Sequence, residues 1–431
     1  MPEFLKLSTP QEAINIFLHA LQEKKPNSET ISTILGMGRV IGEKVIAPHP
    51  LPEFPRSTVD GYALRARETF GALESLPGYL NLVGEIPMGA KPSFVLHPGS
   101  CALIHTGGML PQGADAVIML EYTQRVEPPL PVVGGLDSNL VAEIEISRAV
   151  AEGENTLRIG EEVRKGQVIL QVGSRIRTME IGSCMALGIR ELRVVKRPKI
   201  GILSTGNEVI SPMANPQPGQ VRDVNSYSLA ALVSQAGAEP ILYGIFPDDF
   251  HILEEIAKKA LKECDMVLLS AGSSASALDL TSKIITSLGT PGVLVHGVNV
   301  RPGKPTILAV CDGKAVIGLP GNPVSALIIA GLFVVPVIEK LLGAQPKPKP
   351  TVRAKLTVNI PSQAGREDWV AVKLETNEQI RSDRSGTSFV ARPIFAKSNF
   401  IFTLSQADGL IRIPPEITGM NAGEDVEVNL F

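Results

Sequence analysis

The chain has 431 residues, enough for three or four domains of about 100–150 residues each. A net charge of −3 and an aromatic content of 4% argue against a nucleic-acid binder, and 44% hydrophobic residues is typical of a globular protein. The four cysteines and six histidines show no CxxC, HxH or HExxH spacing, so we expect isolated thiols, structural histidines and a reducing cytoplasm.

The N-terminal third begins without a basic or long apolar stretch, so no signal peptide is expected. Apolar residues recur at helical spacing over 10–24, and a proline-dense stretch at 48–55 should be extended. Residues 56–140 then consist of short apolar runs cut by Gly and Pro, such as 101–104 and 116–120. These runs predict a small β-rich domain.

Three polar clusters stand out in this part of the chain. Asp60 belongs to Ser-Thr-Val-Asp-Gly, Thr106 opens Thr-Gly-Gly-Met-Leu-Pro, and Glu162 ends Gly-Glu-Glu. Glycine-containing clusters of this kind are turns by default. Residues 141–195 add short strands and a predicted helix over 178–187.

Residues 196–342 change character and alternate between strands and helices. This alternation predicts a three-layer α/β domain with a largely parallel sheet. The longest apolar run, 324–338, is too short for a membrane span of about 20 residues, so we expect a buried core helix and no membrane partner. The predicted strands are 199–203, 241–246, 266–270, 294–300 and 315–319, and the predicted helices are 225–236, 249–263, 279–288 and 323–341.

Polar residues follow four of these strands. Because the carboxyl ends of parallel strands meet at one edge, Glu208, Asp248 and Asp279 are expected to hold Mg²⁺ there against phosphate oxygens, with Arg301 on the phosphates. Local alternatives stay open, since Asp248 or Asp249, and also Asp279, could cap a helix instead.

The most informative stretch is 318–326, Gly-Leu-Pro-Gly-Asn-Pro-Val-Ser-Ala, which joins an apolar strand to the apolar helix. Asn322 suits the N-cap, the proline after it suits the first helical position, and Gly321 permits a tight turn. Free amide groups at a helix start attract anions, and Arg301 and Lys304 flank a Pro-Gly turn upstream. The sequence therefore predicts a pocket for a phosphorylated or otherwise anionic small molecule.

The last part of the chain begins with the stiff linker Pro-Lys-Pro-Lys-Pro at 346–350. Alternating runs such as 351–360 and 425–430 predict a small all-β domain. This domain carries two further polar clusters, which contain Arg366 and Ser398.

Taken in order, these motifs resemble the MoeA family, the molybdopterin molybdenumtransferases that also include the E domain of gephyrin. The resemblance runs from about residue 10 to the C-terminus, and so many motifs in register leave little room for chance. The stretches that carry it are 57–63, 106–111, 113–117, 204–208, 218–220 with Asp223 and Asn225, 301–305, 318–326, 407–411 and 422–424.

The resemblance implies a multidomain fold of α/β and β domains. A three-layer α/β molybdopterin-binding domain would span 196–342, a β-rich second domain 53–140, a discontinuous linker domain 1–52 and 141–195, and a C-terminal β-barrel 346–431. A homodimer with its cleft between subunits is also implied.

The implied activity is insertion of molybdate into adenylylated molybdopterin. Hydrolysis of the adenylyl-pyrophosphate, assisted by Mg²⁺ or Zn²⁺, would release AMP. Other proteins of cofactor synthesis are implied partners. The molybdenum ligands are sulfurs of the substrate's dithiolene, so the lack of a cysteine cluster is no objection.

Matching the family's motifs position by position gives the expected site. The implied catalytic residues are Asp60, Thr106, Glu162, Glu208, Asp248 and Asp279, of which the last three are also the implied metal ligands. The implied substrate-binding residues are Gly272, Ser274, Arg301, Lys304, Pro320, Gly321, Asn322, Ser325, Arg366 and Ser398.

One loop, 271–279, departs from the family's Gly-Gly-x-Ser-x-Gly-x-x-Asp pattern. Ala271 and Ser276 replace two glycines, which permit a close backbone approach to phosphate. Because Glu208 and Asp279 remain, we favour an active enzyme. The alternative is a catalytically weak paralogue that acts as a pterin-cofactor-binding scaffold or carrier.

Overall fold

The computed structural model describes residues 7–22, 25–127, 141–271, 275–376 and 389–431. The chain divides into two compact units, and each unit is built from stretches that are separate in the sequence. Unit 1 comprises Met1–Glu43, Val172–Thr178 and Glu191–Phe431, and unit 2 comprises Lys44–Gln171 and Met179–Arg190.

A six-stranded sheet with the order β16-β13-β17-β21-β20-β18 forms the centre of the α/β domain in unit 1. The first four of these strands are parallel, β20 is antiparallel to β21, and β18 is antiparallel to β20, so β18 again runs with the first four. The strands are β13 (Lys199–Thr205), β16 (Glu239–Phe246), β17 (Met266–Ala271), β18 (Pro291–His296), β20 (Ile307–Cys311) and β21 (Lys314–Pro320).

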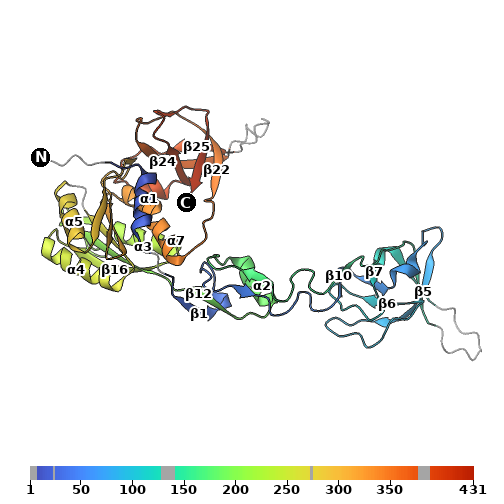
Figure 1. Ribbon diagram of the computed structural model, residues 1–431. Coiled ribbons are helices and arrows are strands. Elements are labelled where there is room, and N and C mark those ends of the chain that lie inside the picture. The colour runs from blue at the N-terminus through green and yellow to red at the C-terminus, as the bar shows by residue number, and fades with distance from the viewer. Residues whose placement is uncertain (1–6, 23–24, 128–140, 272–274, 377–388) are drawn as a thin grey trace, which may run out of the picture. The chain divides into compact units, whose positions relative to one another are not determined.

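Helices cover both faces of this sheet (Figure 1). Val267 and Leu269 of β17 pack with α4 and α5, whereas Met266 and Leu268 pack in the core that contains α1, α3, α6 and α7. Since alternate strand residues point to opposite faces, an uninterrupted apolar strand serves both cores, and the predicted three-layer domain is confirmed. The helices are α1 (Pro10–Ala20), α3 (Asn225–Gln235), α4 (Phe250–Glu263), α5 (Ala275–Ser287), α6 (Pro323–Ile329) and α7 (Val335–Leu342).

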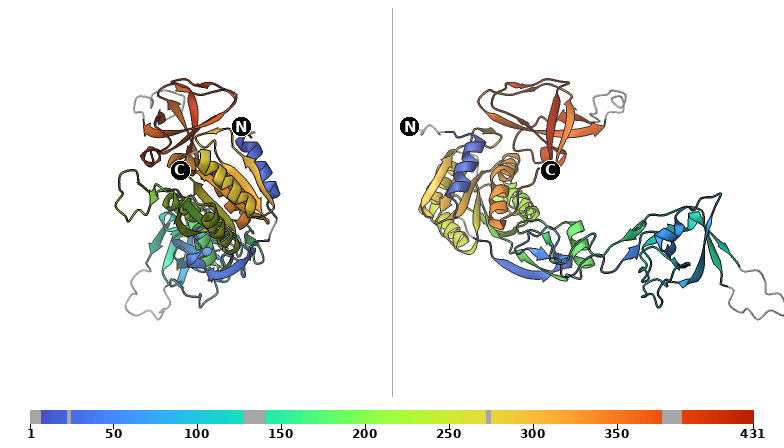
Figure 2. Two further views of the ribbon diagram at one scale, coloured as in Figure 1. Left: turned by 90° about the vertical axis from the view of Figure 1, so that its left-hand side faces the viewer. Right: turned by 45° about the vertical axis from the view of Figure 1, so that its right-hand side comes forward.

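The C-terminal domain is a closed barrel of five strands (Figure 2). The order is β24-β25-β22-β28-β26, and β26 pairs back with β24 to close the ring, which confirms the predicted β-barrel. The elements are β22 (Thr351–Leu356), β24 (Glu367–Thr376), β25 (Phe389–Pro393), β26 (Gly409–Ile413) and β28 (Asp425–Leu430), with β19 (Val300–Arg301) beside β24 and a short helix α8 (Phe402–Ser405).

Two details differ from the predicted strands. β20 was not predicted, and it forms a hairpin with β21 across Asp312 and Gly313, whose φ angles of 50° and 80° are typical of an Asp-Gly turn. The predicted strand that leads to Arg301 ends at His296. Arg301 lies on β19, which pairs with β24, so its expected place at a strand end of the α/β sheet is wrong, because the extended chain leaves that sheet for the barrel.

The apolar helix extends over Pro323–Leu342, close to the predicted 323–341. A π-helical turn, Ala330–Val334, joins α6 to α7, and the run of 20 residues is long and apolar enough to cross a membrane by length and composition alone. Its residues Ile329, Phe333 and Val337 are fully buried in the core of the α/β domain. The predicted helix bounds are therefore correct to within one residue and the expected role as a core helix is confirmed, whereas the prediction that the run is too short to span a membrane is wrong.

Short antiparallel pairs join segments that are far apart in the sequence, which fits a discontinuous linker. α1 lies within the stretch predicted as linker, yet its Ala13 and Phe17 are buried in the α/β core. The domain boundaries themselves stay predictions. In unit 1, β1 (Ser28–Ser32) pairs with β12 (Glu191–Val195). In unit 2, β2 (Val45–Ile46) pairs with β11 (Val168–Leu170), and β3 (Arg56–Ser57) pairs with β10 (Thr156–Leu157). Most of helix α2 (Thr178–Ala186) also lies in unit 2.

The β-rich domain of unit 2 contains a six-stranded mixed sheet with the order β7-β4-β6-β5-β9-β8. All four residues of β4 are buried, and a Cβ atom at Gly61 would collide with the Ile118 carbonyl of β7. A glycine is therefore needed next to Asp60 for the two strands to pair. The strands are β4 (Gly61–Leu64), β5 (Gly78–Glu85), β6 (Ser100–Ile104), β7 (Ala116–Met119), β8 (Thr123–Val126) and β9 (Glu143–Ile146).

Candidate active site

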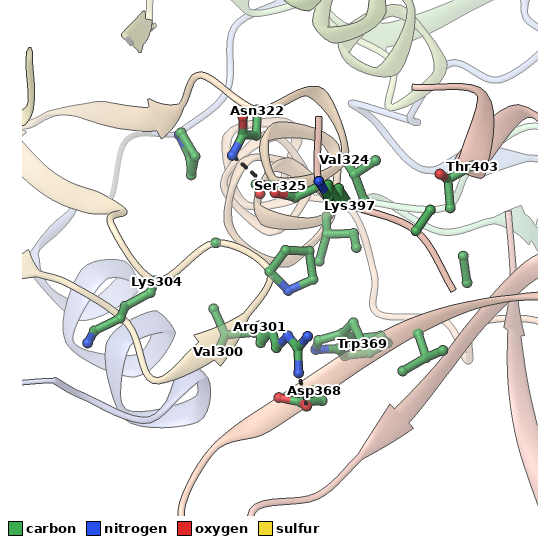
Figure 3. Close-up of a pocket in the computed structure, with 18 of the residues that line it drawn as sticks. Val300, Arg301, Lys304, Asn322, Val324, Ser325, Asp368, Trp369, Lys397 and Thr403 are labelled. Atoms are coloured by element: carbon green, nitrogen blue, oxygen red, sulfur yellow. Dashed lines mark hydrogen bonds and ion pairs between the residues drawn. The ribbon is translucent and has the colours of Figure 1, made fainter. Parts of the chain in front are cut away.

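A pocket of about 900 Å³ in unit 1 is lined by the α/β domain and by the barrel, and we call it the cationic pocket (Figure 3). The 300–305 turn, the start of α6, residues 366–371 and the 394–399 segment form its walls. Its charged lining residues are four cations and one carboxylate, so it attracts anions. They are Arg301, Lys304, Arg366, Lys397 and Asp368.

Asp368 orients the guanidinium groups of this pocket. Its side chain is 4% exposed and accepts from Arg366 Nε at 2.7 Å and from Arg366 Nη2 at 3.0 Å, which is the forked geometry of a strong pair. Arg301 Nη1 lies 3.8 Å from the second carboxylate oxygen, and Figure 3 shows this arginine beside Trp369. One carboxylate balances one of the two guanidinium groups, so a positive charge is left over.

The turn that carries Arg301 and Lys304 is held against α6. The Thr306 hydroxyl donates to the Gly303 carbonyl at 2.6 Å, and Gly303 has a φ of +122°. A Cβ atom at this glycine would collide with the side chain of Ile329. The close approach therefore requires glycine, and it fixes where the two cations emerge.

The start of α6 is partly occupied by the barrel. Pro323 takes the first helical position and Asn322 the N-cap position, as predicted, but the Asn322 side chain does not cap the helix. Its Nδ2 donates to Ser398 Oγ at 3.0 Å, and the Val324 N–H donates to the Ser398 carbonyl at 3.1 Å. The helix start is thus less open to an anion than predicted, while Asn322, Ser325 and Ser398 all line the cationic pocket.

A second pocket, of about 430 Å³, lies at the carboxyl ends of β13 and β17, and we call it the inner pocket. Asn322 and Asn399 line both pockets, so the two share a wall. The other polar residues of the inner pocket are Ser204, Thr205, Glu208, Arg222, Asp223, Asn225 and Ser270.

A small ribbon positions the carboxylates of the inner pocket. β14 (Val209–Ile210) pairs in parallel with β15 (Val221–Arg222), so Glu208 directly precedes the ribbon and Asp223 directly follows it. Gly206 has a φ of +142°, and a Cβ atom there would be 2.9 Å from Glu208 Oε2. The Glu208 carboxylate therefore lies over the end of β13, next to the pocket.

The three carboxylates predicted as metal ligands are all exposed: Glu208, Asp248 and Asp279. Among the residues that the structure describes, no group of three His, Cys, Asp or Glu side chains could hold a metal ion. Asp249 rather than Asp248 caps α4, through the Ile252 N–H at 3.0 Å. Asp279 lies inside α5, so the N-cap interpretation of this residue is wrong.

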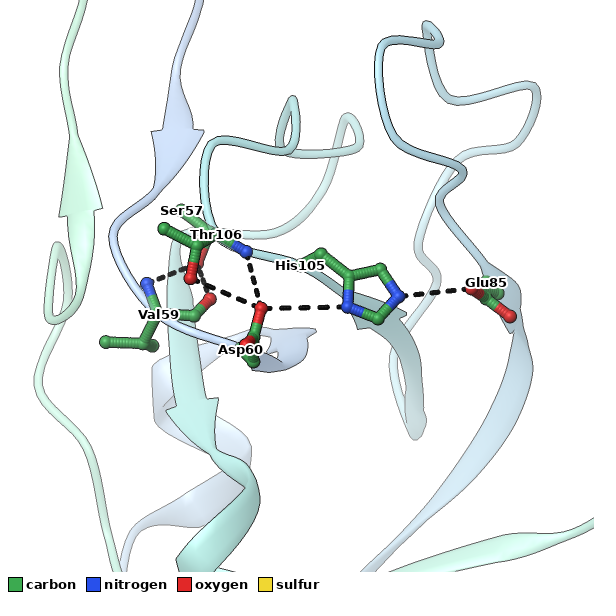
Figure 4. A network of polar contacts seen from close by, with 6 residues as sticks. All are labelled: Ser57, Val59, Asp60, Glu85, His105 and Thr106. Atoms are coloured by element: carbon green, nitrogen blue, oxygen red, sulfur yellow. Dashed lines mark hydrogen bonds and ion pairs between the residues drawn. The ribbon is translucent and has the colours of Figure 1, made fainter.

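Unit 2 brings Asp60 and Thr106 together (Figure 4). The Thr106 N–H and hydroxyl donate to Asp60 Oδ1 at 2.8 Å and 3.2 Å. The backbone bond is the main reason why the pKa of Asp60 lies below its usual value of 3.8. His105 lies between two carboxylates, with Nδ1 3.6 Å from Asp60 Oδ1 and Nε2 3.1 Å from Glu85 Oε1.

Among the described residues, Glu162 makes no hydrogen bond or ion pair with the Asp60, Thr106, His105 and Glu85 side chains. Its side chain is exposed, and its N–H donates to the Leu51 carbonyl at 3.0 Å. Pro320 and Gly321 lie at the end of β21 and line the cationic and the inner pocket, respectively. Gly272 and Ser274 lie outside the described residues.

Sequence reasoning assigned no role to several residues of these sites, among them Lys397, Asp368, His105 and Asn225. Asp368 had a local signal, because it lies two residues after Arg366 in an extended segment and so on the same side. His105 precedes Thr106, but its partner Glu85 comes from another strand. Asn225 was part of a motif without an assigned role.

Comparisons with known proteins agree with this architecture. The family models that match are "MoeA N-terminal region (domain I and II)" over residues 8–188, "Probable molybdopterin binding domain" over 201–340 and "MoeA C-terminal region (domain IV)" over 353–431. Fold and pockets thus define a multidomain protein built around an α/β domain of the molybdopterin-binding type.

Full-length relatives make the assignment specific. Molybdopterin molybdenumtransferase 2 of Mycobacterium tuberculosis is 31% identical over 403 residues, covering 93% of this chain and 94% of the relative. The molybdopterin molybdenumtransferase of a Nostoc species is 31% identical over 411 residues, covering 94% and 89%. The solved MoeA structure of Pyrococcus horikoshii matches with a TM-score of 0.82 and 32% identity over 99% of this chain and 100% of that one. The chain belongs to the MoeA family.

Proposed function

We propose that this chain inserts molybdate into adenylylated molybdopterin and releases AMP by hydrolysis of the adenylyl-pyrophosphate. The observation that carries the proposal is the charge of the cationic pocket, which is lined by four cationic side chains and one carboxylate and shares a wall with the inner pocket. The names of relatives that cover more than nine tenths of the chain support the same transfer.

The charge of the substrates matches the cationic pocket. Molybdate is a dianion, and the pyrophosphate adds further negative charge, so cations are needed to bind both. The guanidinium forks of Arg301 and Arg366 suit oxyanions, and Lys304 and Lys397 add point charges. Since Asp368 already orients Arg366, less side-chain freedom is lost when the oxyanion binds.

A divalent cation, Mg²⁺ or Zn²⁺, belongs to the proposal with one restriction. The described residues form no complete set of metal ligands, so they would bind a cation only when the substrate's phosphates supply the remaining ligands. Mg²⁺ commonly takes one or two carboxylates from the protein and its other ligands from phosphate and water. We propose Glu208 as the first of these carboxylates, with Asp248 and Asp279 at the same edge. When bound, the cation would neutralise charge on the pyrophosphate.

We also propose that the protein is a homodimer that works in the cytoplasm with other proteins of cofactor synthesis as partners. All four cysteines are free and buried, which suits a reducing compartment. Sedimentation analysis of the purified chain tests the dimer, and a monomer at micromolar concentration would contradict it.

The competing proposal is a pterin-cofactor scaffold or carrier, which the two replaced glycines of the 271–279 loop favour, together with Asn207 at a position where the family usually has Asp. The two are separated by incubating the full chain with adenylylated molybdopterin and Mg²⁺, with molybdate or tungstate in parallel, and measuring AMP. The transferase predicts oxyanion-dependent release of AMP that D279A abolishes without loss of the fold. Binding of the pterin compound without AMP release would overturn the transferase and leave the carrier.

A further inference from the structure

Arg301 is the less restrained of the two guanidinium groups in the cationic pocket. Its side chain is 65% exposed, and its Nη1 lies 3.8 Å from Asp368 Oδ2, which is beyond hydrogen-bond distance. Arg366 already donates to both oxygens of that carboxylate. A long side chain that moves freely loses conformational entropy when it binds an oxyanion, so its contribution to affinity depends on what limits its movement.

Trp369 forms the wall of the cationic pocket beside Arg301 (Figure 3). β19 pairs in parallel with β24, so that Arg301 lies opposite Asp368, one residue before this tryptophan. The indole is partly buried and packs against the apolar core of the α/β domain. A large, rigid ring at this place limits the directions that are open to the guanidinium group.

Glu367 holds the indole in its orientation. Its side chain is 6% exposed, and its Oε1 accepts from Trp369 Nε1 at 2.8 Å. Its Oε2 accepts from Arg412 Nε at 2.8 Å and from Arg412 Nη2 at 2.7 Å. Arg412 lies on β26 directly opposite Trp369, at the strand pair that closes the barrel. Because a tryptophan side chain has only two rotatable bonds, one hydrogen bond to its N–H is enough to fix the ring.

We propose that Trp369 is a positioning residue for oxyanion binding, which keeps Arg301 directed into the cationic pocket, and that Glu367 and Arg412 act through it. The inference rests on the proposed function, in which this pocket binds molybdate and phosphates. The alternative is that the Glu367–Arg412 pair only stabilises the barrel. In that case its loss would lower the unfolding midpoint and leave the affinity for oxyanions unchanged.

The test is a calorimetric titration of the full chain with sodium molybdate, with urea unfolding measured alongside. We expect W369A to weaken molybdate binding about tenfold, because Arg301 loses its wall. E367Q should weaken it about fivefold, since a glutamine has one oxygen and its amide group would face either the indole N–H or Arg412, both of which are donors. E375Q removes the other arginine–glutamate fork of this barrel, away from the pocket, and should leave the affinity unchanged.

A double-mutant cycle shows whether Trp369 acts through Arg301. R301K keeps the charge, so molybdate binding stays measurable, but it removes the planar group beside the indole. In the R301K background the further loss caused by W369A should shrink from about tenfold to about twofold or less. The same tenfold loss in both backgrounds would overturn the proposal, because Trp369 would then act without Arg301.

A second variant keeps the result decisive if buried Glu367 does not tolerate substitution. The side chain of Arg412 is half exposed, so R412Q is expected to fold, and it should weaken molybdate binding in the same direction as E367Q. Unchanged affinity in folded W369A and R412Q would overturn the proposal. Absence of molybdate binding by the unsubstituted chain would overturn it as well.

The inference and the proposed function can fail separately. Molybdate affinity that depends on Trp369 and Arg301, in a chain that releases no AMP from the adenylylated substrate, would contradict the transferase and keep the positioning role. Oxyanion-dependent AMP release by a chain whose molybdate affinity is the same in W369A and R412Q would do the reverse.

Discussion

Replacing Asp368 with Asn tests how the cationic pocket is held together. The substitution keeps the shape of the side chain but removes the charge that Arg366 meets at 2.7 Å and 3.0 Å. The side chain of Asp368 is 4% exposed and that of Arg366 25% exposed, so water can replace the lost interaction only in part. Losing a charge-assisted bond in such a place lowers the free energy of unfolding by about 2 kcal/mol.

The barrel offers its own probe for this measurement. Trp369 is the only tryptophan of the chain and lies next to Asp368 on β24, so its fluorescence during urea unfolding reports on this domain. With an m-value of about 1.5 kcal/mol/M, a loss of about 2 kcal/mol lowers the urea midpoint by about 1.3 M.

A matched pair on the same barrel serves as the control. Arg392 and Glu375 form the same fork at 3.1 Å and 3.2 Å, but their side chains are 58% and 41% exposed. Exposed pairs contribute little because water and salt screen them, so E375Q should leave the midpoint unchanged. Equal midpoints for D368N and E375Q would refute the reasoning that burial makes the first pair important.

Three further predictions follow from local geometry. G303A should destabilise the α/β domain strongly, because the φ angle of Gly303 is positive and the added Cβ atom would collide with Ile329. G331A, with open space around the new Cβ atom, should be neutral or slightly stabilising. Similar unfolding midpoints for the two variants would contradict this reasoning. The lowered pKa of Asp60 means that its contribution to stability is present above pH 3.8 and is lost as the pH falls through the lowered value. Because the backbone bond is the larger cause, T106V should raise the pKa of Asp60 only part of the way to 3.8, as read by NMR titration of the carboxyl carbon, and a full return would show that the hydroxyl dominates. All four thiols are buried and their pKa values are raised chiefly by burial, so a thiol reagent at pH 8 should label none in the native chain and four after unfolding; rapid native labelling would contradict the burial.

Periodicity was enough to predict most of the α/β core. β17 and β21 are uninterrupted apolar runs because both faces of these strands are buried, and their helices carry the matching spacing of 3.6 residues. We did not predict β20 from the sequence, because we assumed a strict alternation of strands and helices, which leaves no place for an antiparallel hairpin. The Asp-Gly pair at 312–313 was the local signal that marked it.

The site was predictable in pieces. Arg301, Lys304 and Arg366 were expected as substrate-binding cations on the resemblance, and the structure brings them to one pocket. The expectation of an open helix start at 318–326 failed in part, because it considered α6 alone. Ser398, which belongs to the barrel, accepts a hydrogen bond from one amide group at the start of α6 and another from the Asn322 side chain.

By itself, the sequence determined the order of the elements, the three-layer α/β core, the barrel and the family. These features depend on burial and on local backbone preferences, which leave regular marks along a chain. The tertiary structure alone decided that Asp368 aligns Arg366 beside Arg301, and that Ser398 of the barrel meets the start of α6. The reason is physical: a hydrogen bond depends on tenths of an ångström and on direction, which are set by the packing of segments far apart in sequence rather than by any periodicity.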